Sequence, residues 1–492
     1  MADLQCMLHQ AGTIARDRPA IYAPDIRIGY GEFDLMVSAT AAWLRTSGVN
    51  AGQRVALYME NNWAAATLVL ALIRIGAVPA PLSTRLPVKA VRQQLDRIDC
   101  RTLIARVRES SRKVLDGITC LDPDGLIDRT LTTGQAQDCF VLDSAAPASI
   151  VFTSGQSGTP KAVVHSYGNH YYSALGVNRH LRLRSSDCWL LSLPLYHVGG
   201  LGILFRCLHA GAALATMTHG QSLVDALTAY PVTHCSLVPT QLRRLLEAGI
   251  PTEKRTALRA VVVGGGPVAP ALLDEARRAG WPVLASYGST EMTSQITAGQ
   301  PTKAVGAHHH AGRVLPYREL RLAADGEIEV RGATFCLGYA TGAAVHAPLG
   351  PTGWWATGDY GRLDAQGNLQ VTGRKDHMFC SGGENIQPEE IEAALLALPG
   401  IMQAVVVPVP HADYGQRPMA FIEDTQQRDA SALRAALTTQ LPAFKIPDQF
   451  HAWPTQLASH GIKPPRSALA QQAQTLAGNI QQSTRNSQRP CR

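Results

Sequence analysis

The chain has 492 residues, a length at which polypeptides usually divide into two or more domains. Hydrophobic residues make up 46% of it and charged residues 17%, which is a globular composition and excludes a disordered chain. The formal net charge of +7 favours anionic ligands such as nucleotides. Nucleic acid is not an expected partner, because the basic residues are dispersed and are not interleaved with aromatic residues.

The sequence predicts a cytoplasmic protein without a membrane span. Residues 1–6 contain neither a basic leader nor an apolar core, so no signal peptide is expected. The apolar run Trp63–Ile73 ends at Arg74, well short of the roughly 20 residues that cross a bilayer. The ten cysteines are scattered without a CxxC pair, which favours reduced thiols over disulfides or a zinc site. The sequence leaves open whether the chain forms a homo-oligomer.

Residues 1–145 alternate helical and extended patterns, which is typical of an α/β arrangement. Phe33–Leu44 and Trp63–Ile75 have helical spacing, whereas Arg54–Tyr58 predicts a strand and Ala77–Leu82 an extended segment. We therefore predict a first α/β subdomain over these residues.

Residues 146–312 show the same alternation more regularly and predict a second α/β subdomain. Its apolar stretches predict strands at 148–152, 162–165, 188–193, 212–217, 232–238, 259–263 and 282–286. Helical patterns between them lie at 224–229, 241–248 and 269–279. A mostly parallel sheet with helices on its faces follows, with ligand loops at the C-terminal ends of its strands.

Residues 313–375 change character and predict β-hairpins, because alternating stretches are separated by Asp325-Gly326 and Gln366-Gly367. We expect a small β-barrel or sheet there, which completes an N-terminal domain of residues 1–375. Residues 376–470 predict a compact, mobile α+β C-terminal domain. Its helices are expected at 388–397 and 430–440, and its strands at 402–408, 418–422 and 447–453. The Gln/Ser/Asn-rich residues 471–492 predict a flexible tail.

The segment Thr153–Lys161 follows an apolar strand and combines hydroxyls, glycines and a lysine. Gly155 and Gly158 permit backbone angles at which successive N–H groups form an anion-binding nest. The segment is not a Walker A loop, which needs four residues between its glycines. A stretch of this kind is often only a turn, but its donors also suit a polyphosphate.

Several later clusters have a similar polar, glycine-rich character. Val263–Pro267 ends a strand, so a flat ring can approach its backbone, although a tight turn fits it equally well. Tyr287–Glu291 offers an aromatic face, hydroxyls and a carboxylate that can hold Mg²⁺ against phosphate oxygens. Gly353–Asp359 places a carboxylate after a turn, where it suits ribose hydroxyls or serves as a turn residue. Gly373–Asp376 precedes the glycine turn and acidic helix start of Phe379–Ile391.

In order and spacing, these motifs resemble the adenylate-forming superfamily of acyl- and aryl-CoA ligases, peptide-synthetase adenylation domains and luciferases. The resemblance covers about residues 10–470. Several segments are most similar to the o-succinylbenzoate–CoA ligases of menaquinone biosynthesis: Ala162–His165, Ser192–Gly200, Leu237–Leu242, Cys380–Glu390 and Gly461–Lys463. The chain departs from the family pattern at Gln156, at Ala162 and in the lysine motif His460-Gly-Ile-Lys463.

The resemblance implies the adenylate-forming fold and an ATP-dependent, AMP-forming ligase that uses Mg²⁺ and transfers an acyl group to CoA. The residues that would cradle the β- and γ-phosphates are Thr153, Ser154, Gly155, Ser157, Gly158 and Lys161. Thr290 would contact the α-phosphate as a catalytic residue, and Glu291 would hold Mg²⁺. The residues that would flank adenine are Gly264, Gly265, Gly266 and Tyr287, and those that would hold the ribose are Asp359 and Arg374.

The family also implies a second arrangement of the C-terminal domain. Lys463 would first bridge the carboxylate and the α-phosphate as a catalytic residue. Rotation about the hinge Asp376 would then remove Lys463 and bring the pantetheine-contacting residues to the tunnel through which CoA enters. Those residues are Ser381, Gly382 and Gly383.

The expected substrate is a small carboxylic acid other than an α-amino acid, because the segment around Tyr196-His197 lacks the Asp that pairs with an amino group. By resemblance, His197 would contact an aryl acid during catalysis, although a lone His is more often structural. Arg206, on the apolar helix Leu201–Ala210, would pair with the second carboxylate of a dicarboxylic acid, or else would only reach toward solvent. The remaining pocket walls would be Ser286, Ser289 and Gly265.

The leading hypothesis is therefore an o-succinylbenzoate–CoA ligase, and two alternatives remain. One is another aryl- or acyl-CoA ligase, such as a benzoate- or coumarate-like enzyme. The other is a non-catalytic paralogue that binds an adenylate or acyl ligand, which the intact Lys161, Glu291 and Asp359 argue against. A metal site at His308-His-His310 is not expected, because three neighbouring side chains cannot all face one ion on a regular element.

Overall fold

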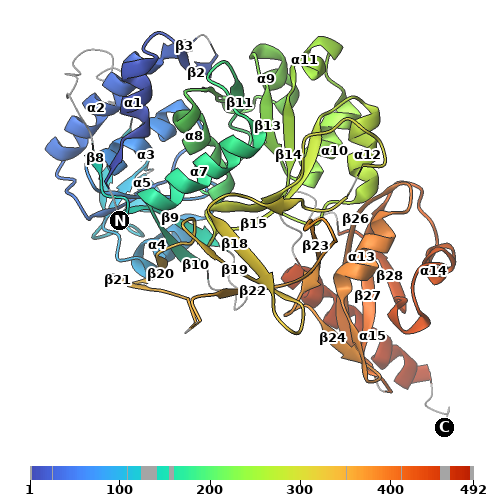
Figure 1. Cartoon of the computed structure of the whole chain (residues 1–492). Coiled ribbons are helices and arrows are strands. Elements are labelled where there is room, and N and C mark those ends of the chain that lie inside the picture. The colour runs from blue at the N-terminus through green and yellow to red at the C-terminus, as the bar shows by residue number, and fades with distance from the viewer. Residues whose placement is uncertain are drawn as a thin grey trace.

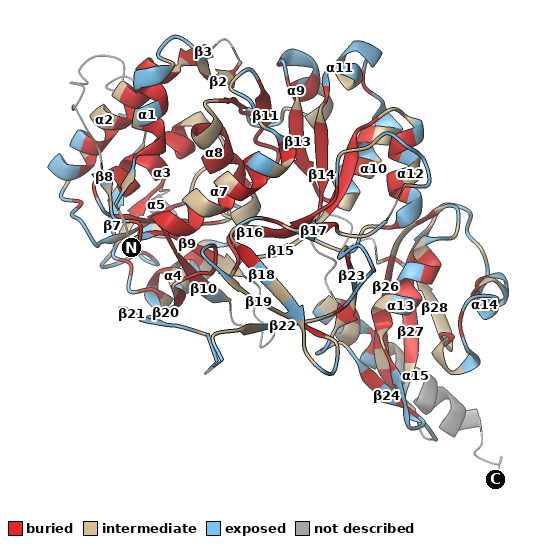
Figure 2. Cartoon of the chain, viewed as in Figure 1, coloured by how far each residue is buried: buried red, intermediate tan, exposed pale blue. Residues whose placement is uncertain are grey.

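The structure is a computed structural model, which describes residues 3–24, 26–107, 109–123, 141–153, 160–307, 309–350, 352–411, 413–454 and 466–487. Figure 1 shows a large N-terminal α/β domain, coloured blue to yellow, and a smaller C-terminal domain in orange and red. Figure 2 shows that buried residues line the central strands, while exposed residues lie on the outer turns of the covering helices.

A nine-stranded sheet forms the centre of the N-terminal domain, in the order β17-β16-β15-β14-β13-β11-β12-β2-β3. The strands from β15 to β2 in that order are parallel, and the outer strands are antiparallel. Their bounds are β2 (Pro19–Ala23), β3 (Ile26–Gly29), β11 (Cys188–Leu190), β12 (Ala213–Ala215), β13 (His234–Leu237), β14 (Ala260–Val263), β15 (Val283–Ser289), β16 (Ser294–Ala298) and β17 (Arg313–Val314).

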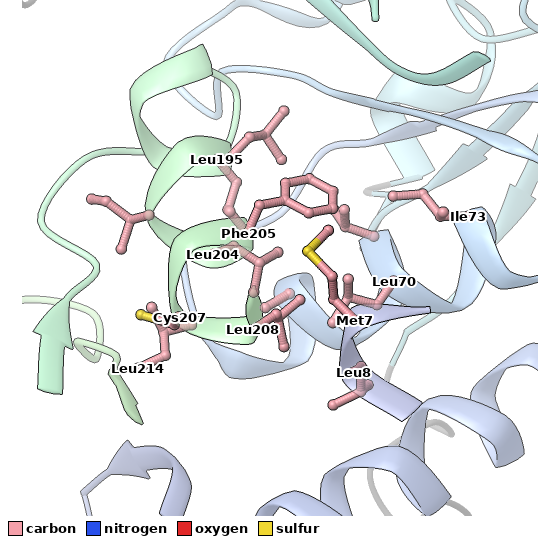
Figure 3. Packing of buried hydrophobic residues seen from close by; sticks show 14 of the residues in the cluster. Met7, Leu8, Leu70, Ile73, Leu195, Leu204, Phe205, Cys207, Leu208 and Leu214 are labelled. Carbon is pink, nitrogen blue, oxygen red and sulfur yellow. The ribbon is translucent and has the colours of Figure 1, made fainter. Parts of the chain in front are cut away.

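Both faces of this sheet are covered, which explains why its strands are continuous apolar runs. Along β14, Val262 packs into the cluster on one face, whereas Val261 and Val263 pack into the cluster on the other. Figure 3 shows part of the first cluster, in which Met7 of α1 lies near Phe205 of α8. The covering helices are α1 (Met7–Ile14), α2 (Tyr30–Thr46), α7 (Tyr167–Leu181), α8 (Val198–Ala210), α9 (Leu223–Ala229), α10 (Pro239–Ala248), α11 (Thr252–Ala257) and α12 (Pro270–Arg278).

Smaller sheets complete this domain. A parallel sheet contains β4 (Arg54–Leu57), β5 (Val78–Pro81), β6 (Thr102–Ile104) and β7 (Thr119–Leu121), with helices α3 (Trp63–Arg74), α4 (Val88–Arg97) and α5 (Glu109–Arg112) between them in the chain. An antiparallel sheet contains β9 (Pro147–Thr153), β10 (Lys161–Ser166), β20 (Gly338–Thr341) and β21 (Ala344–His346). Two short strands, β1 (Leu4–Gln5) and β8 (Val141–Leu142), pair with each other.

The predicted subdomain boundary at residues 145/146 is wrong in two respects. Strands β2 and β3, from the first predicted subdomain, belong to the central sheet, where β2 pairs with β12. Strands β9 and β10, predicted for the parallel sheet, instead pair antiparallel with each other. The short connection between them permits a hairpin, whereas a parallel pair needs a longer crossover.

The segment expected to form a small barrel or sheet is a four-stranded antiparallel sheet in the order β18-β19-β22-β23. Its strands are β18 (Arg318–Leu322), β19 (Glu327–Gly332), β22 (Trp355–Leu363) and β23 (Leu369–Arg374). In Figure 1 this sheet lies between the central sheet and the C-terminal domain. Its last strand, β23, ends two residues before the expected hinge at Asp376.

The C-terminal domain has the predicted α+β composition. Its elements are β24 (Phe379–Ser381), β25 (Glu384–Ile386), α13 (Pro388–Leu396), β26 (Ile401–His411), β27 (Gly415–Asp424), α14 (Ala430–Thr438), the 3₁₀ turn η1 (Ala443–Lys445), β28 (Gln449–Ala452) and α15 (Arg466–Ser487). Residues 471–487, for which the sequence predicts a flexible tail, continue helix α15. Leu469 and Ala473 of this helix are buried in a cluster with Val405 and Val407 of β26.

Within the described ranges, every helix is too short or too polar to cross a membrane.

Candidate active site

The motifs singled out in the sequence follow strands that end at one edge of the central sheet. Strands β11, β13, β14 and β15 are parallel, so their C-terminal ends lie together. The segment with His197 follows β11, and Gly264–Gly266 follow β14. The Tyr287–Glu291 motif lies at the end of β15 and in the turn beyond it. Ligands of open α/β sheets bind at such an edge.

Tyr287, Asp359 and Arg374 form a hydrogen-bonded group, although they are far apart in the chain. The Tyr287 hydroxyl donates to Oδ2 of Asp359 at 2.7 Å, and Nη1 of Arg374 donates to Oδ1 at 2.8 Å. Asp359 and Arg374 face each other because β22 and β23 pair in that register. Nε of Arg374 also donates to Oδ1 of Asp376 at 2.9 Å, so the group extends to the expected hinge residue.

The electrostatics of this group favour a charged Asp359–Arg374 pair beside a neutral tyrosine. Burial and the charge of Asp359 raise the pKa of Tyr287 well above its ordinary value. Burial alone would lower the pKa of Arg374, but the carboxylates of Asp359 and Asp376 outweigh it, so the pKa is raised. The structure thus places Asp359 in strand β22 rather than in a turn, as a half-buried carboxylate held from two sides.

A second group joins Glu291 and Lys161 through Tyr339 of β20. The Tyr339 hydroxyl donates to Oε1 of Glu291 at 2.9 Å, and Nζ of Lys161 lies 4.9 Å from the centre of the Tyr339 ring. The sequence motifs did not indicate Tyr339. It reaches the site because β20 pairs with β10, which places Tyr339 opposite Val163. Such pairing between distant strands leaves no local signal in the sequence.

Thr290 and Glu291 lie in a turn directly after β15. The N–H of Thr293 donates to the carbonyl of Thr290 at 3.1 Å, and the N–H of Cys336 donates to the carbonyl of Glu291 at 2.7 Å. Ser289, predicted as a pocket wall, accepts from the N–H of Met292 at 3.2 Å and so caps this turn. Both side chains expected at the α-phosphate and the metal therefore lie on a backbone fixed at several points.

The glycines after β14 lie against the neighbouring strand. A Cβ at Gly264 would come within 2.7 Å of Oγ of Ser286, which shows that β15 approaches the backbone there. Gly265 has φ +82°, which other residues rarely adopt, whereas a Cβ at Gly266 would meet open space. Gly264 and Ser286 therefore lie against each other at the C-terminal ends of β14 and β15.

His197 and Arg206 both belong to α8 but have different surroundings. His197 is the N-cap residue, half-buried, with its ring 4.7 Å from that of Tyr196. Arg206 is only 2% exposed. Its guanidinium lies 5.3 Å from the Trp189 ring, and Nη2 donates to Oγ of Ser294 at 3.0 Å. Arg206 therefore does not reach solvent, so the alternative prediction that its side chain only extends toward water is wrong.

The charge of Arg206 has no protein counter-ion in the part of the chain that the structure describes. None of the described carboxylates pairs with it, and its Nε has no hydrogen-bond acceptor among these residues. Burial lowers the pKa of Arg206 to about 10, so it remains charged at neutral pH. A buried cation without a counter-ion is costly, and a bound anion would compensate for it.

Thr153 is the last residue of β9, and the other predicted residues lie in the C-terminal domain or outside the described ranges. Ser381 ends β24, and Gly382 and Gly383 form the turn to β25, with φ +59° at Gly382 and +90° at Gly383. Nη1 of Arg417 donates to Oγ of Ser381 at 3.4 Å, and the N–H of Gly382 donates to the carbonyl of Tyr414 at 2.9 Å. The predicted residues outside the described ranges are Ser154, Gly155, Ser157, Gly158 and Lys463.

The structure describes the histidine run at residues 308–310 only in part. The structure describes His309 and His310 but not His308, and His309 lies 3.5 Å from Asp274. Among the described residues, no three His, Cys, Asp or Glu side chains are grouped to hold a metal ion.

Comparison with protein families matches residues 8–340 to the AMP-binding enzyme family and residues 390–459 to the AMP-binding enzyme C-terminal domain. The chain belongs to the AMP-binding enzyme family. The predicted superfamily and fold class are thereby confirmed.

This AMP-binding enzyme is similar to curated and solved relatives over most of its length. It is 34% identical over 453 residues to the 2-succinylbenzoate–CoA ligase of Salmonella typhimurium, covering 92% of this chain and 94% of the relative. It resembles an E. coli MenE variant with bound OSB-AMS, with a TM-score of 0.82, 29% identity, and coverage of 96% of this chain and 99% of the other.

A further similar structure is o-succinylbenzoate CoA synthetase from Bacillus subtilis in complex with the acyl-adenylate intermediate OSB-AMP. Its TM-score is 0.82, with 28% identity and coverage of 92% of this chain and 95% of the other. The same Bacillus enzyme has also been solved in complex with ATP and a magnesium ion, with a TM-score of 0.80, 28% identity and coverage of 92% and 96%.

Proposed function

We propose that this AMP-binding enzyme is a 2-succinylbenzoate–CoA ligase, which activates the acid with ATP and transfers the acyl group to CoA. The relatives at 34% and 32% identity carry that name, which agrees with the hypothesis from the sequence. The observation that carries the substrate assignment is the buried, uncompensated charge of Arg206. A dicarboxylic acid would bring one carboxylate to react and a second to pair with this arginine.

The first half-reaction converts a carboxylate, which is a poor acyl donor, into an acyl-adenylate. A carboxylate oxygen attacks the α-phosphorus of ATP, the bond to the bridging oxygen breaks, and pyrophosphate leaves with the electron pair. Catalysis of such a step is mainly positioning and stabilisation of the developing negative charge. In our proposal Asp359 accepts the ribose hydroxyls, the Gly264–Gly266 wall and Tyr287 flank the adenine, and Thr290 contacts the α-phosphate.

The phosphate side would be held by residues at the ends of the hairpin of β9 and β10. Thr153 and Lys161 are register partners there, and the predicted loop between them supplies the remaining donors. Lys161 lies over the Tyr339 ring and Glu291 accepts from the Tyr339 hydroxyl, so a cation and a carboxylate contact the same side chain. Mg²⁺ takes oxygen ligands from one or two carboxylates and from phosphates, so Glu291 fits it, and bound Mg²⁺ would supply positive charge to the phosphate oxygens.

The second half-reaction would require another position of the C-terminal domain. The sulfur of the CoA thiol attacks the acyl carbonyl and releases its proton to solvent, and AMP leaves with the electron pair of the broken C–O bond. We propose that Lys463 serves the first step and that Ser381, Gly382 and Gly383 serve the second, after rotation at Asp376. The boundary between the domains is accordingly proposed at residues 375/376.

On the acyl side, we propose that His197 contacts the aryl ring and that Arg206 binds the second carboxylate, directly or through water. Ser286, Ser289 and Gly265 would form the remaining walls. The proposal also includes a cytoplasmic location, since ATP and CoA are its substrates and the described cysteines are free thiols. It assigns no nucleic-acid partner and leaves the oligomeric state to a measurement of mass in solution.

The test compares Arg206→Ala and Arg206→Lys with the wild type, in assays of substrate-dependent pyrophosphate release. Arg206→Ala should raise KM for 2-succinylbenzoate about 100-fold, since a buried charge-assisted contact contributes roughly 2–3 kcal/mol. KM for a monocarboxylic aryl acid should stay within about twofold, because that acid makes no such contact. Arg206→Lys should lie between the two. Equal losses with both acids would refute the assignment of Arg206.

A further inference from the structure

A chain of three buried polar side chains leads from α7 to the turn that carries Thr290. Nε2 of His170 lies 2.8 Å from Oγ of Ser149, which lies 3.3 Å from Nδ1 of His165. Nε2 of His165 in turn lies 2.7 Å from the carbonyl oxygen of Thr290. All three side chains are at most 1% exposed. No motif in the sequence assigned a function to them.

The direction of these hydrogen bonds follows from the last acceptor. A carbonyl oxygen only accepts, so Nε2 of His165 must carry the proton. The Nδ1 atom of a neutral imidazole then accepts, so the Ser149 hydroxyl donates to it and receives a hydrogen bond from Nε2 of His170. Burial lowers the pKa of His165 to about 4 and that of His170 well below its ordinary value, so both rings are neutral at pH 7. Ser149 therefore selects the His165 tautomer that can bond Thr290.

The turn that receives this hydrogen bond contains backbone in sparsely populated conformations. Thr293 has φ +51° and Ser294 has φ +96°, although neither is glycine. Such conformations are strained and persist only where the surroundings fix them. At this end of the turn, Oγ of Ser173 donates to the carbonyl of Thr293 at 2.6 Å, and Oγ1 of Thr293 donates to the carbonyl of Thr334 at 2.7 Å. His165 holds the opposite end, at Thr290.

Strand β10 thereby connects the two parts of the phosphate site. Lys161 begins the strand, and His165 lies four residues later on the same face, because side chains alternate along a strand. The Lys161 ammonium lies over the Tyr339 ring, and the Tyr339 hydroxyl donates to Glu291. His165 contacts the backbone carbonyl of Thr290 directly. A shift of the turn relative to β10 would change both spacings together.

We propose that His165, with its tautomer selected by Ser149, is a positioning residue that fixes Thr290 and Glu291 for adenylate formation. The inference rests on the proposed roles of Thr290 and Glu291. It distinguishes His165 from a histidine that only fills the core, since its bonding partner is the backbone of the residue placed at the α-phosphate. His165 touches neither substrate in this proposal and acts only through the turn.

The experiment compares His165→Leu with His165→Gln, in assays of 2-succinylbenzoate-dependent pyrophosphate release. Leu removes the donor, whereas the Gln side-chain amide can place an N–H where Nε2 of His165 stood. His165→Leu should lower kcat about 30-fold with KM for ATP within about threefold, since misplacement by about 1 Å costs up to 100-fold. His165→Gln should recover kcat to within about threefold of the wild type. Ser149→Ala, which frees the tautomer, should lower kcat about fivefold.

His180 offers a matched control, because its Nε2 also lies 2.7 Å from a backbone carbonyl, that of Gly299. His180→Leu should leave kcat within about twofold, and it should lower thermal stability no more than His165→Leu does, because His180 is only half-buried. The proposal is overturned if His165→Gln is no better than His165→Leu, or if His180→Leu loses as much kcat. If His165→Leu does not fold, His165→Gln and Ser149→Ala test the proposal instead. Equal, large losses of kcat in both variants would contradict the positioning role of His165. An unchanged kcat in Ser149→Ala would contradict it as well.

Thr290→Ala separates this inference from the proposed function. If Thr290→Ala leaves kcat unchanged, the assignment of Thr290 fails, and with it the reason for positioning the turn. If Thr290→Ala lowers kcat while His165→Leu does not, the positioning role alone fails.

Discussion

The proposed nucleotide half and the proposed acyl half of the site differ in how their buried charge is compensated. On the nucleotide side, Asp359 already has Arg374 and Tyr287 as partners, so its carboxylate is compensated before any ligand binds. On the acyl side, Arg206 is buried beside Trp189 and Ser294, and no described carboxylate pairs with it. One half is organised by the protein alone, whereas the other has a charge that a substrate would complete.

The difference has a physical reason. Ribose hydroxyls are neutral, so a carboxylate that binds them needs its own counter-ion within the protein. A substrate carboxylate brings its own charge, and pairing with an uncompensated arginine makes binding specific, since an acid without that group leaves the cation buried and alone. We therefore expect substitutions in the two halves to change different quantities: kcat/KM for ATP, KM for the acid, or the free energy of unfolding.

The largest effect should come from Asp359→Ala. The change removes the proposed ribose acceptor and, among the described residues, leaves Asp376 as the carboxylate partner of Arg374. We expect kcat/KM for ATP to fall about 100-fold or more, since charge-assisted hydrogen bonds contribute roughly 1.5–3 kcal/mol each. Initial rates of pyrophosphate release at varied ATP concentration would measure it. Asp325→Ala, which removes a carboxylate from the exposed Lys375 pair, serves as the control and should change the same ratio less than about threefold.

If Asp359→Ala raised KM for the acid and left kcat/KM for ATP unchanged, the proposed division into two halves would be contradicted. An equal loss in Asp325→Ala would contradict it too, since that residue lies at the surface.

A smaller and more selective effect is expected from Asp376→Pro. Proline fixes φ, so it should restrict rotation of the C-terminal domain. Adenylation should remain within about threefold, whereas thioester formation should slow about tenfold, because only the second step needs the other domain position. Pyrophosphate release and thioester formation, assayed separately, would show the split. Asp376→Ala removes the Arg374 contact but leaves φ free, and it should affect thioester formation less.

Equal losses of both half-reactions in Asp376→Pro would argue for damage to the nucleotide group through Arg374, and against a hinge.

The smallest effect should be on the stability of Arg206→Met. Replacing an uncompensated buried cation with an apolar side chain of similar length should leave the free energy of unfolding within about 1 kcal/mol or raise it. Asp359→Ala should instead lower it by about 1–2 kcal/mol, because it breaks a partly buried pair. Urea unfolding of the unliganded variants would measure both. A marked destabilisation by Arg206→Met would show that the protein itself compensates this charge.

Local patterns of apolar and polar residues predicted much of the fold. The strands β11 to β15 of the central sheet and the helices α9, α10 and α12 lie where apolar periodicity placed them, because burial on one or two faces leaves a period in the sequence. The motifs also predicted the family, since glycines, hydroxyls and a carboxylate at strand ends are determined locally. The helical continuation into residues 471–487 escaped prediction, because its polar composition conceals the buried Leu469 and Ala473.

What the sequence determined by itself was which residue types stand at which strand ends, and hence the class of chemistry. Only the tertiary structure showed which of them meet: Tyr339 with Glu291, Asp359 with Arg374, and His165 with Thr290. It also showed that Arg206 is buried without a counter-ion among the described residues, which an isolated basic residue on an apolar helix does not reveal. These facts depend on pairing between distant strands and on burial, and neither leaves a period or a motif in the chain.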